Sequence, residues 1–176
     1  EEMELGGIVN FIAFRQAVAG YNRIKEKSKP ILTLIDFSKP STEKRFFVFD
    51  MEKKQLLFSS VVSHGRNSGG NYATSFSNQN GSYKSSLGFY LTENTYQGGN
   101  GYSLILNGLE KGINDKAKER SIVVHGASYA NPTVAASGRL GRSLGCPALP
   151  TKLAKPIINT IKDGSVMFIY ANNSSY

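Results

Sequence analysis

The segment 142-RSLGCPALP-150 contains Cys146, the only cysteine of this 176-residue chain. Gly145 allows a close approach of the backbone, and Pro147 disfavours the α-helical region for the cysteine between them. The segment therefore predicts a thiol on a tight, extended turn. A single cysteine forms no internal disulfide, so it is an inert core thiol, an intermolecular bridge or a nucleophile.

Histidine is also scarce, and the chain has two, His64 and His125. His125 ends the apolar run 121-SIVVHG-126, which is typical of a β-strand, and Gly126 allows a turn at its tip. A cysteine nucleophile needs a base, because the thiolate is the reactive species and an ordinary thiol has a pKa of about 8.5. An imidazole facing the turn with Cys146 is placed to take that proton. A structural histidine is the alternative interpretation, and these few residues do not readily form a zinc site.

The same residues resemble a known family. The pair 125-HG-126, followed by 143-SLGC-146, is similar to the His-Gly … Ser/Thr-His-Gly-Cys signature of the L,D-transpeptidases (YkuD-like catalytic domains). The resemblance covers most of the chain and indicates a divergent murein L,D-transpeptidase branch. Its segments, in order, are 36-DFSKPS-41, 63-SHGRNSG-69, 75-SFSNQNGS-82, 85-SSLGFYLT-92, 101-GYSLILNGLEKGIND-115, 120-RSIVVHGASY-129 and 138-GRLGRSLGCPAL-149.

Two positions depart from the family pattern. Leu144 replaces the histidine of Ser-His-Gly-Cys, and Pro147 stands where many members have arginine. The catalytic histidine of the family is the upstream one, and His125 retains it. Arg139 or Arg142 would then replace the missing arginine, because a guanidinium binds a carboxylate through two parallel hydrogen bonds.

The resemblance implies acyl transfer through a thioester on Cys146. The donor would be a peptidoglycan tetrapeptide stem, cut after its third residue with release of D-alanine. An amine of a neighbouring stem would then complete a 3-3 type crosslink or attachment. His125 would be the base, oriented by the carbonyl of Gly126. The amide of Cys146, helped by that of Gly145, would stabilise the oxyanion.

Four further residues are candidates for substrate binding: His64, Ser143, Arg139 and Arg142. His64 lies in 63-SHGRNSG-69, whose glycines suggest a backbone shaped for contact with a ligand. A loop histidine that caps its own turn is the alternative. No metal and no cofactor are expected.

Three other functions stay open at this point. If water resolves the acyl-enzyme, the protein is an L,D-carboxypeptidase. A non-catalytic peptidoglycan-binding module would keep the groove and tolerate loss of Cys146. A general cysteine peptidase would act on protein substrates and need no D-residue.

The composition is that of a globular protein, with 40% hydrophobic and 19% charged residues. The length suits a single catalytic domain over residues 1–176, with residues 1–30 as an N-terminal helical segment packed on it. The net charge of +8 suits an anionic polymer such as bacterial cell wall. Basic and acidic residues alternate and no nucleic-acid motif occurs, so we expect no nucleic-acid partner.

No apolar stretch approaches the roughly twenty residues of a membrane span. The first residues, 1-EEMELGG-7, lack the basic and apolar regions of a signal peptide. The resemblance implies a periplasmic or otherwise exported protein of the cell envelope. Membrane contact would then come only through an anchor that has been removed.

Hydrophobic patterning predicts a mainly β fold with an N-terminal and a C-terminal helix, and the resemblance implies a curved, β-sandwich-like mixed sheet with the Cys–His pair in a groove. Apolar residues at three- and four-residue spacing predict a helix within 7–27. A second helix is predicted over 151–163, with Thr151 as N-cap or Pro156 as its first residue. Long ordered loops are expected between 65 and 101. Strands are predicted at 31–37, 45–50, 55–63, 87–92, 102–107, 121–125 and 165–170, with 51-MEKK-54 as a hairpin connection.

Overall fold

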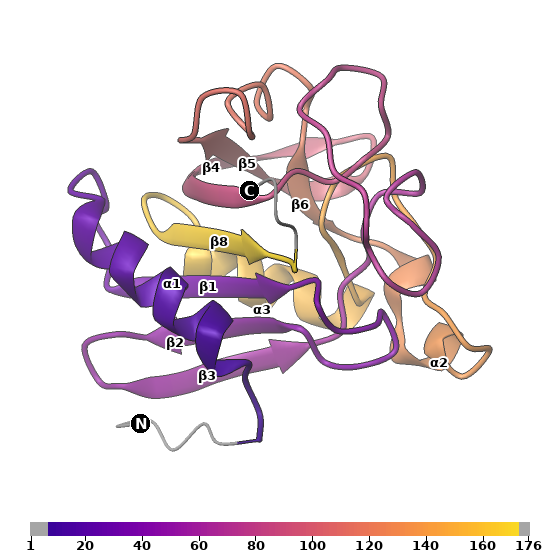
Figure 1. The fold of residues 1–176 in the computed structure, drawn as a ribbon, viewed down its shortest axis with the longest axis horizontal. Coiled ribbons are helices and arrows are strands. Elements are labelled where there is room, and N and C mark those ends of the chain that lie inside the picture. The colour runs from indigo at the N-terminus through magenta and orange to yellow at the C-terminus, as the bar shows by residue number, and fades with distance from the viewer. Residues whose placement is uncertain (1–6, 173–176) are drawn as a thin grey trace.

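A computed structural model describes residues 7–172 and centres on one mixed sheet in the order β3-β2-β1-β8-β4-β5-β6-β7 (Figure 1). The strands are β1 (Ile31–Asp36), β2 (Phe46–Asp50), β3 (Gln55–Ser60), β4 (Gly88–Gly98), β5 (Gly101–Gly108), β6 (Val123–Gly126), β7 (Ala148–Leu149) and β8 (Val166–Tyr170). The helices are α1 (Phe11–Arg23), α2 (Pro132–Ala135) and α3 (Thr151–Ile161), with a 3-10 helix η1 (Ser128–Ala130). The predicted mainly β, curved mixed sheet is confirmed.

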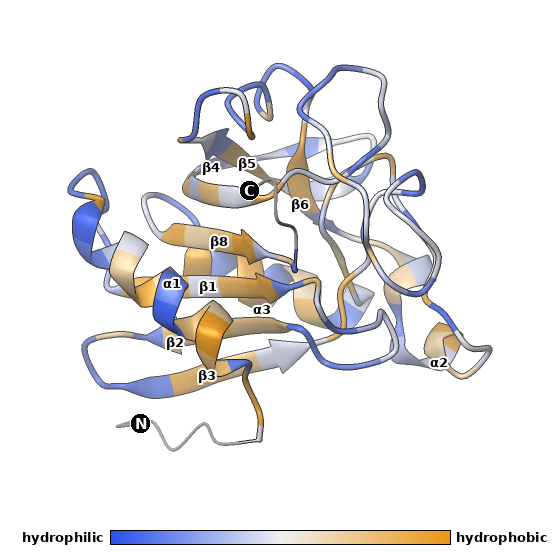
Figure 2. Ribbon diagram, in the orientation of Figure 1, coloured by the Kyte–Doolittle hydropathy of each residue, from blue (hydrophilic) through white to orange (hydrophobic). Residues whose placement is uncertain are grey.

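Strand β1 lies in the interior of the sheet and is buried at every position. It pairs in parallel with β8 and antiparallel with β2. Side chains alternate between the faces of a strand, so Leu32 and Leu34 pack in the core under α1, while Ile35 joins the core that includes α3. A strand covered on both faces has an uninterrupted apolar sequence, and β1 and β8 are orange over most of their length in Figure 2.

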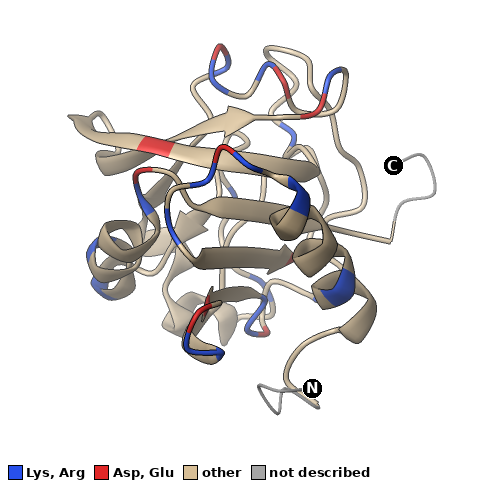
Figure 3. Cartoon of the chain, turned by 90° about the vertical axis from the view of Figure 1, so that its left-hand side faces the viewer, with Lys and Arg blue, Asp and Glu red and all other residues tan. Residues whose placement is uncertain are grey.

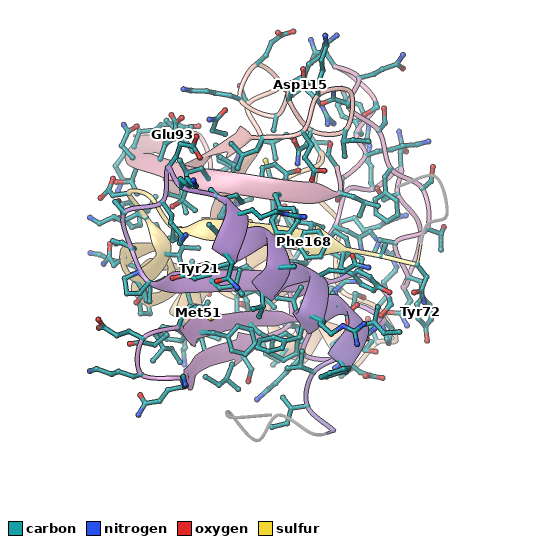
Figure 4. The ribbon with its side chains drawn as sticks, turned by 60° about the vertical axis from the view of Figure 1, so that its left-hand side comes forward. Tyr21, Met51, Tyr72, Glu93, Asp115 and Phe168 are labelled. Atoms are coloured by element: carbon teal, nitrogen blue, oxygen red, sulfur yellow. The ribbon has the colours of Figure 1, made fainter. Side chains whose placement is uncertain are left out.

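Helix α1 begins after Asn10, whose side-chain oxygen accepts hydrogen bonds from the amides of Ile12 and Ala13. The helix is shorter than the predicted 7–27, and residues 1–6 lie outside the described part. The predicted apolar stripe is partly wrong, because Phe11 and Ile12 are 51% and 60% exposed. Small residues form much of the buried face of α1. A Cβ on Gly20 would come within 2.0 Å of the Phe89 ring, so the close packing there requires glycine. Tyr21 of α1 shares this core with Phe168 and Met51, and the three are labelled in Figure 4.

Helix α3 begins at Thr151, the start of the predicted range 151–163. Pro150 occupies the N-cap position, so the prediction of Thr151 as N-cap is wrong, and so is the alternative start at Pro156. The side-chain oxygen of Asn131 accepts from the Thr151 amide at 2.9 Å and supplies the missing cap. Pro156 lies inside the helix, where it removes one backbone hydrogen bond. The buried residues of α3 are Ala154, Ile157, Ile158 and Ile161.

The remaining predicted strands are found within a few residues of their expected bounds, and the 51–54 hairpin between β2 and β3 is confirmed. Strand β4 continues to Gly98, beyond the predicted end at 92, because its polar far end forms an exposed hairpin with β5. The short elements β7, α2 and η1 were not predicted. Within residues 7–172, no helix combines the length and the hydropathy that a membrane span requires.

Candidate active site

Cys146 and His125 lie on neighbouring segments at one edge of the sheet. His125 pairs with Ala148 across the parallel β6–β7 ladder, and Cys146 lies just before β7. The thiol sulfur of Cys146 accepts a hydrogen bond from the Val123 amide at 3.4 Å. Val123 and His125 project from the same face of β6, because strand residues two apart share a face. The thiol therefore lies against the backbone of β6, two residues before His125 along the strand.

Cys146 is 8% exposed, and its thiol donates to the carbonyl of Ser121 at 3.5 Å. Burial raises its pKa, while the amide of Val123 and the charge of Arg120 act in the opposite direction. The resting group is thus a neutral thiol. In this arrangement the thiol proton is directed at the Ser121 carbonyl, and a role of His125 in taking it up stays a prediction.

The ring of His125 is fixed by a backbone carbonyl. Its Nδ1 lies 2.9 Å from the oxygen of Gly126, and a carbonyl only accepts, so Nδ1 is the protonated nitrogen. Nε2 therefore keeps its lone pair and can act as a base. A Cβ on Gly126 would lie 2.8 Å from the Cβ of Ala154, so glycine allows this carbonyl to sit close to α3.

Ser143 closes the turn that carries the nucleophile. Its hydroxyl donates to the Cys146 carbonyl at 2.6 Å and accepts from the Gly145 amide at 3.1 Å. Ser143 is 3% exposed and so shapes the turn, whereas its contact with substrate stays a prediction. The Gly145 amide is engaged by Ser143, and within residues 7–172 the Cys146 amide makes no hydrogen bond. Of the two expected oxyanion donors, the Cys146 amide is therefore the one available to an incoming ligand.

The segment 63–69 supports the turn from the side away from β6. The Ser143 amide donates to the His64 carbonyl at 3.0 Å, and the Arg66 amide donates to the Ser143 carbonyl at 2.8 Å. The His64 ring is 1% exposed, accepts from Arg45 at 2.8 Å and donates to the Gly69 carbonyl at 3.1 Å. The buried ring therefore fixes the segment whose backbone bonds to the turn. Its direct contact with substrate stays a prediction.

His64→Ala is expected to destabilise the protein in a pH-dependent way. Burial, followed by the charge of Arg45, lowers the His64 pKa from 6.5 to about 4. A lowered folded-state pKa stabilises the protein above pH 6.5, and this stabilisation is lost as the pH falls toward 4, because the unfolded chain takes up the proton first. The variant also leaves a buried Arg45 donor without its acceptor, so we expect a loss of about 3 kcal/mol at neutral pH.

Urea unfolding of wild type and His64→Ala at about pH 7.5 and pH 5 measures this effect. The difference in unfolding free energy should be smaller at the lower pH. An equal difference at both pH values would show that the neutral ring contributes no pH-linked stability.

The two candidate arginines lie differently. Arg142 is exposed and donates from one terminal nitrogen to the carbonyls of Arg66 and Gly69, at 3.1 and 3.3 Å. These bonds hold it beside the turn. Arg139 is partly exposed and makes no hydrogen bond among residues 7–172. The structure therefore orders Arg142 near the turn, while a substrate contact of either residue stays a prediction.

Two residues near the thiol were not among the predicted site residues. Arg120 has a guanidinium whose charge acts on Cys146, and Tyr129 has a pKa raised to about 12 by burial and by the neighbouring thiolate form of Cys146. In the sequence, Arg120 ends the charged run 116-KAKER-120, which is typical of a solvated surface. Its position directly before the β6 segment was the available signal.

A pocket of about 230 Å³ adjoins the thiol. Tyr96, Ser103 and His125 are successive cross-strand partners, so they share the face of the sheet on which the pocket opens. Two of its lining residues, Ser121 and Val123, also contact the Cys146 sulfur. The pocket is lined by Tyr96, Ile105, Lys118, Ser121, Ile122 and Val123. Cys146 and His125 are not among these lining residues, so the pocket lies next to the thiol and does not contain it.

Comparison with known proteins identifies the family of this chain. A family model described as the L,D-transpeptidase catalytic domain matches residues 7–170. The chain therefore belongs to the L,D-transpeptidase catalytic domain family, as the resemblance predicted. No curated protein matches the sequence.

Solved structures share the fold. A helical cell shape determining protein from Campylobacter jejuni is 15% identical with a TM-score of 0.54, covering 94% of this chain and 58% of that chain. An L,D-transpeptidase from Mycobacterium tuberculosis H37Rv is 15% identical with a TM-score of 0.50, covering 80% and 57%. At such identities the likeness shows the fold alone. The chain spans less than two thirds of the length of either protein.

Proposed function

We propose that the protein is a murein L,D-transpeptidase that uses Cys146 to transfer an acyl group from a peptidoglycan tetrapeptide stem. The observation that carries this proposal is a single thiol held against the strand that also carries an oriented imidazole. The Gly126 carbonyl lies 2.9 Å from Nδ1 of His125, so Nε2 of the neutral ring is free to act as a base. The thiol lies on a turn whose cysteine amide has no hydrogen-bond partner among residues 7–172.

In the first half-reaction, Nε2 of His125 takes the Cys146 proton and the thiolate attacks the carbonyl of the third stem residue. The oxyanion that forms accepts a hydrogen bond from the Cys146 amide. The intermediate collapses as the C–N bond breaks, and His125 returns the proton to the departing D-alanine amine. The product is a thioester between Cys146 and the shortened stem.

In the second half-reaction, an amine of a neighbouring stem attacks the thioester, and His125 takes a proton from it. The C–S bond breaks, the thiol regains its proton, and a 3-3 type crosslink or attachment results. Water in place of the amine gives a shortened stem and makes the protein an L,D-carboxypeptidase. The same side chains serve both outcomes, so the acceptor decides between them.

Product analysis tests the proposal. Purified protein is incubated with disaccharide-tetrapeptide, and the products are separated and weighed by liquid chromatography and mass spectrometry. Crosslinked dimers that lack one D-alanine support transpeptidation, and disaccharide-tripeptide alone identifies the carboxypeptidase. Unchanged substrate at all enzyme concentrations contradicts both, and casein cleavage in its place would indicate a general cysteine peptidase.

The charge of the protein supports an anionic substrate in the cell envelope. The net charge is +8, and Figure 3 shows Lys and Arg on several separate loops and helix ends instead of one continuous strip. Dispersed positive charge favours loose attraction to an anionic polymer such as cell wall. We therefore place the protein in the periplasm or an equivalent exported compartment.

Replacing Arg139 and Arg142 together by lysine is expected to weaken binding of the donor stem. Lysine keeps the charge but loses the two-pronged grip on a carboxylate. We expect KM for the tetrapeptide to rise about tenfold, while kcat changes less than threefold, because the chemistry at Cys146 is untouched. Alkylation of the thiol by iodoacetamide serves as the control and should keep its wild-type rate. A wild-type KM in the double variant would show that neither arginine contributes to the binding of the donor stem.

A further inference from the structure

We propose that Arg120 is a positioning residue for Cys146, which fastens the segment 77–86 against the nucleophile turn and holds a permanent positive charge beside the thiol. The inference extends the proposed function and rests on it only for the role of the thiol in acyl transfer. It concerns contacts of the segment 77–86, which also bonds to the residues that follow His64, through Gly65 and Ser68.

Arg120 uses both terminal nitrogens on the segment 77–86. Nη1 donates to the Ser77 carbonyl at 3.0 Å and to the Ser86 hydroxyl at 2.9 Å. Nη2 donates to the Ser82 hydroxyl at 3.1 Å and to the Lys84 carbonyl at 2.8 Å. A planar guanidinium satisfies four acceptors in this arrangement, which a single ammonium does not reproduce. The segment is thereby fixed at several points to one side chain.

The guanidinium also lies directly against the nucleophile turn. A Cβ built on Gly145 would lie 3.0 Å from the Lys84 carbonyl oxygen and 3.4 Å from Nη2 of Arg120. Gly145 has a φ of +127°, so the turn needs glycine here for its conformation as well as for space. The residue before Cys146 therefore packs on Arg120 and on the carbonyl that Arg120 holds.

A cation in this place favours the thiolate. Burial raises the Cys146 pKa, and the positive charge of Arg120 lowers it. Burial lowers the Arg120 pKa, yet a guanidinium stays charged throughout the neutral range. Its charge is therefore present whether or not His125 carries a proton.

The other groups around the turn hold different positions. His125 lies on β6, the strand whose Val123 amide bonds the thiol. Tyr129 acts on the thiol from η1 with a pKa of about 12 and is neutral near pH 7. The Lys84 ammonium donates to the Ser75 hydroxyl at 2.6 Å. Arg142, at the start of the turn, directs one terminal nitrogen to the carbonyls of Arg66 and Gly69. Arg120 is the cation whose charge lowers the pKa of the thiol.

The test measures the pH dependence of Cys146 alkylation by iodoacetamide in wild type, Arg120→Gln and Arg120→Lys. Lys116→Gln is the matched control, because it removes one positive charge from an exposed side chain of the same segment. Thermal unfolding of each variant comes first, and alkylation is run well below the lowest unfolding temperature. The midpoint of the pH profile measures the pKa of the thiol, whereas the plateau rate measures how accessible the thiol is to the reagent.

For Arg120→Gln we expect the midpoint to move to higher pH. The rate near pH 7 should fall on the order of tenfold, because loss of an adjacent opposite charge raises the pKa of a thiol by about one unit. Arg120→Lys should keep a midpoint closer to the wild-type one, with an altered plateau because the segment 77–86 is less firmly held. Lys116→Gln should match wild type in both. A wild-type midpoint in Arg120→Gln overturns the inference.

The alkylation assay needs no peptidoglycan, so its outcome is separate from that of the proposed function. A shifted midpoint together with wild-type protein that leaves tetrapeptide intact would retain Arg120 as a modulator of the thiol and reject the transpeptidase. An unshifted midpoint in a protein that crosslinks stems would reject the role of Arg120 alone.

Discussion

Cys146→Ser is expected to abolish acyl transfer from disaccharide-tetrapeptide, with turnover at or below the detection limit. A serine hydroxyl has a pKa far above neutral, and one imidazole does not activate it as it activates a thiol. The substitution is close to isosteric and the side chain is 8% exposed, so the fold should persist. Turnover is measured by release of D-alanine, with thermal unfolding as the check on folding.

The single cysteine makes the control simple. Iodoacetamide should add one group to the wild type and none to Cys146→Ser. A carbapenem should behave in the same way, because its strained lactam carbonyl is an activated amide that a thiolate opens to form a stable adduct. Turnover of Cys146→Ser within tenfold of wild type would move the nucleophile to another residue.

His125→Ala should lower kcat by about 10²-fold or more, which is the usual contribution of a positioned general base. The loss should be similar in kcat/KM, because the proton is transferred in the transition state and not in the bound ground state. In the double variant with Cys146→Ser, activity should fall hardly further than in Cys146→Ser alone, because the two side chains act as one unit.

The second histidine supplies the matched control for this measurement. His64→Ala removes the same side chain from a site bonded to Arg45 and Gly69, so its main effect should be on stability, with thiol alkylation retained. The assignment of the base is wrong if His125→Ala keeps more than a third of wild-type kcat. It is also wrong if folded His64→Ala protein loses as much kcat as His125→Ala does.

Much of the fold follows from hydrophobic pattern. The run 31–37 is apolar at nearly every position because β1 is covered on both faces, and the 3.6-residue spacing in 7–27 reflects an α1 that packs on one of them. The pattern failed where tertiary contacts decide. Thr151 is not the N-cap of α3, because the side chain of Asn131, distant in sequence, caps the helix instead, and β4 extends past residue 92 because β5 pairs with it.

The candidate site divides in a similar way. Cys146 and His125 stand out in the sequence because each is scarce and flanked by glycine. The engagement of the Gly145 amide by Ser143 follows from the closed shape of the turn, which residue types alone do not reveal. Arg120 and Tyr129 reach the thiol only through the packing of separate loops, and a charged run such as 116–120 ordinarily indicates a solvated surface.

Mass spectrometry of the intact protein during reaction with disaccharide-tetrapeptide tests the central claim most directly. The account predicts a wild-type species whose mass is increased by that of disaccharide-tetrapeptide less one D-alanine, and no other covalent species. This species should disappear on addition of an acceptor amine and be absent from Cys146→Ser. A protein that turns over tetrapeptide without any covalent species, or that carries the same adduct after Cys146→Ser, would contradict the thioester on Cys146.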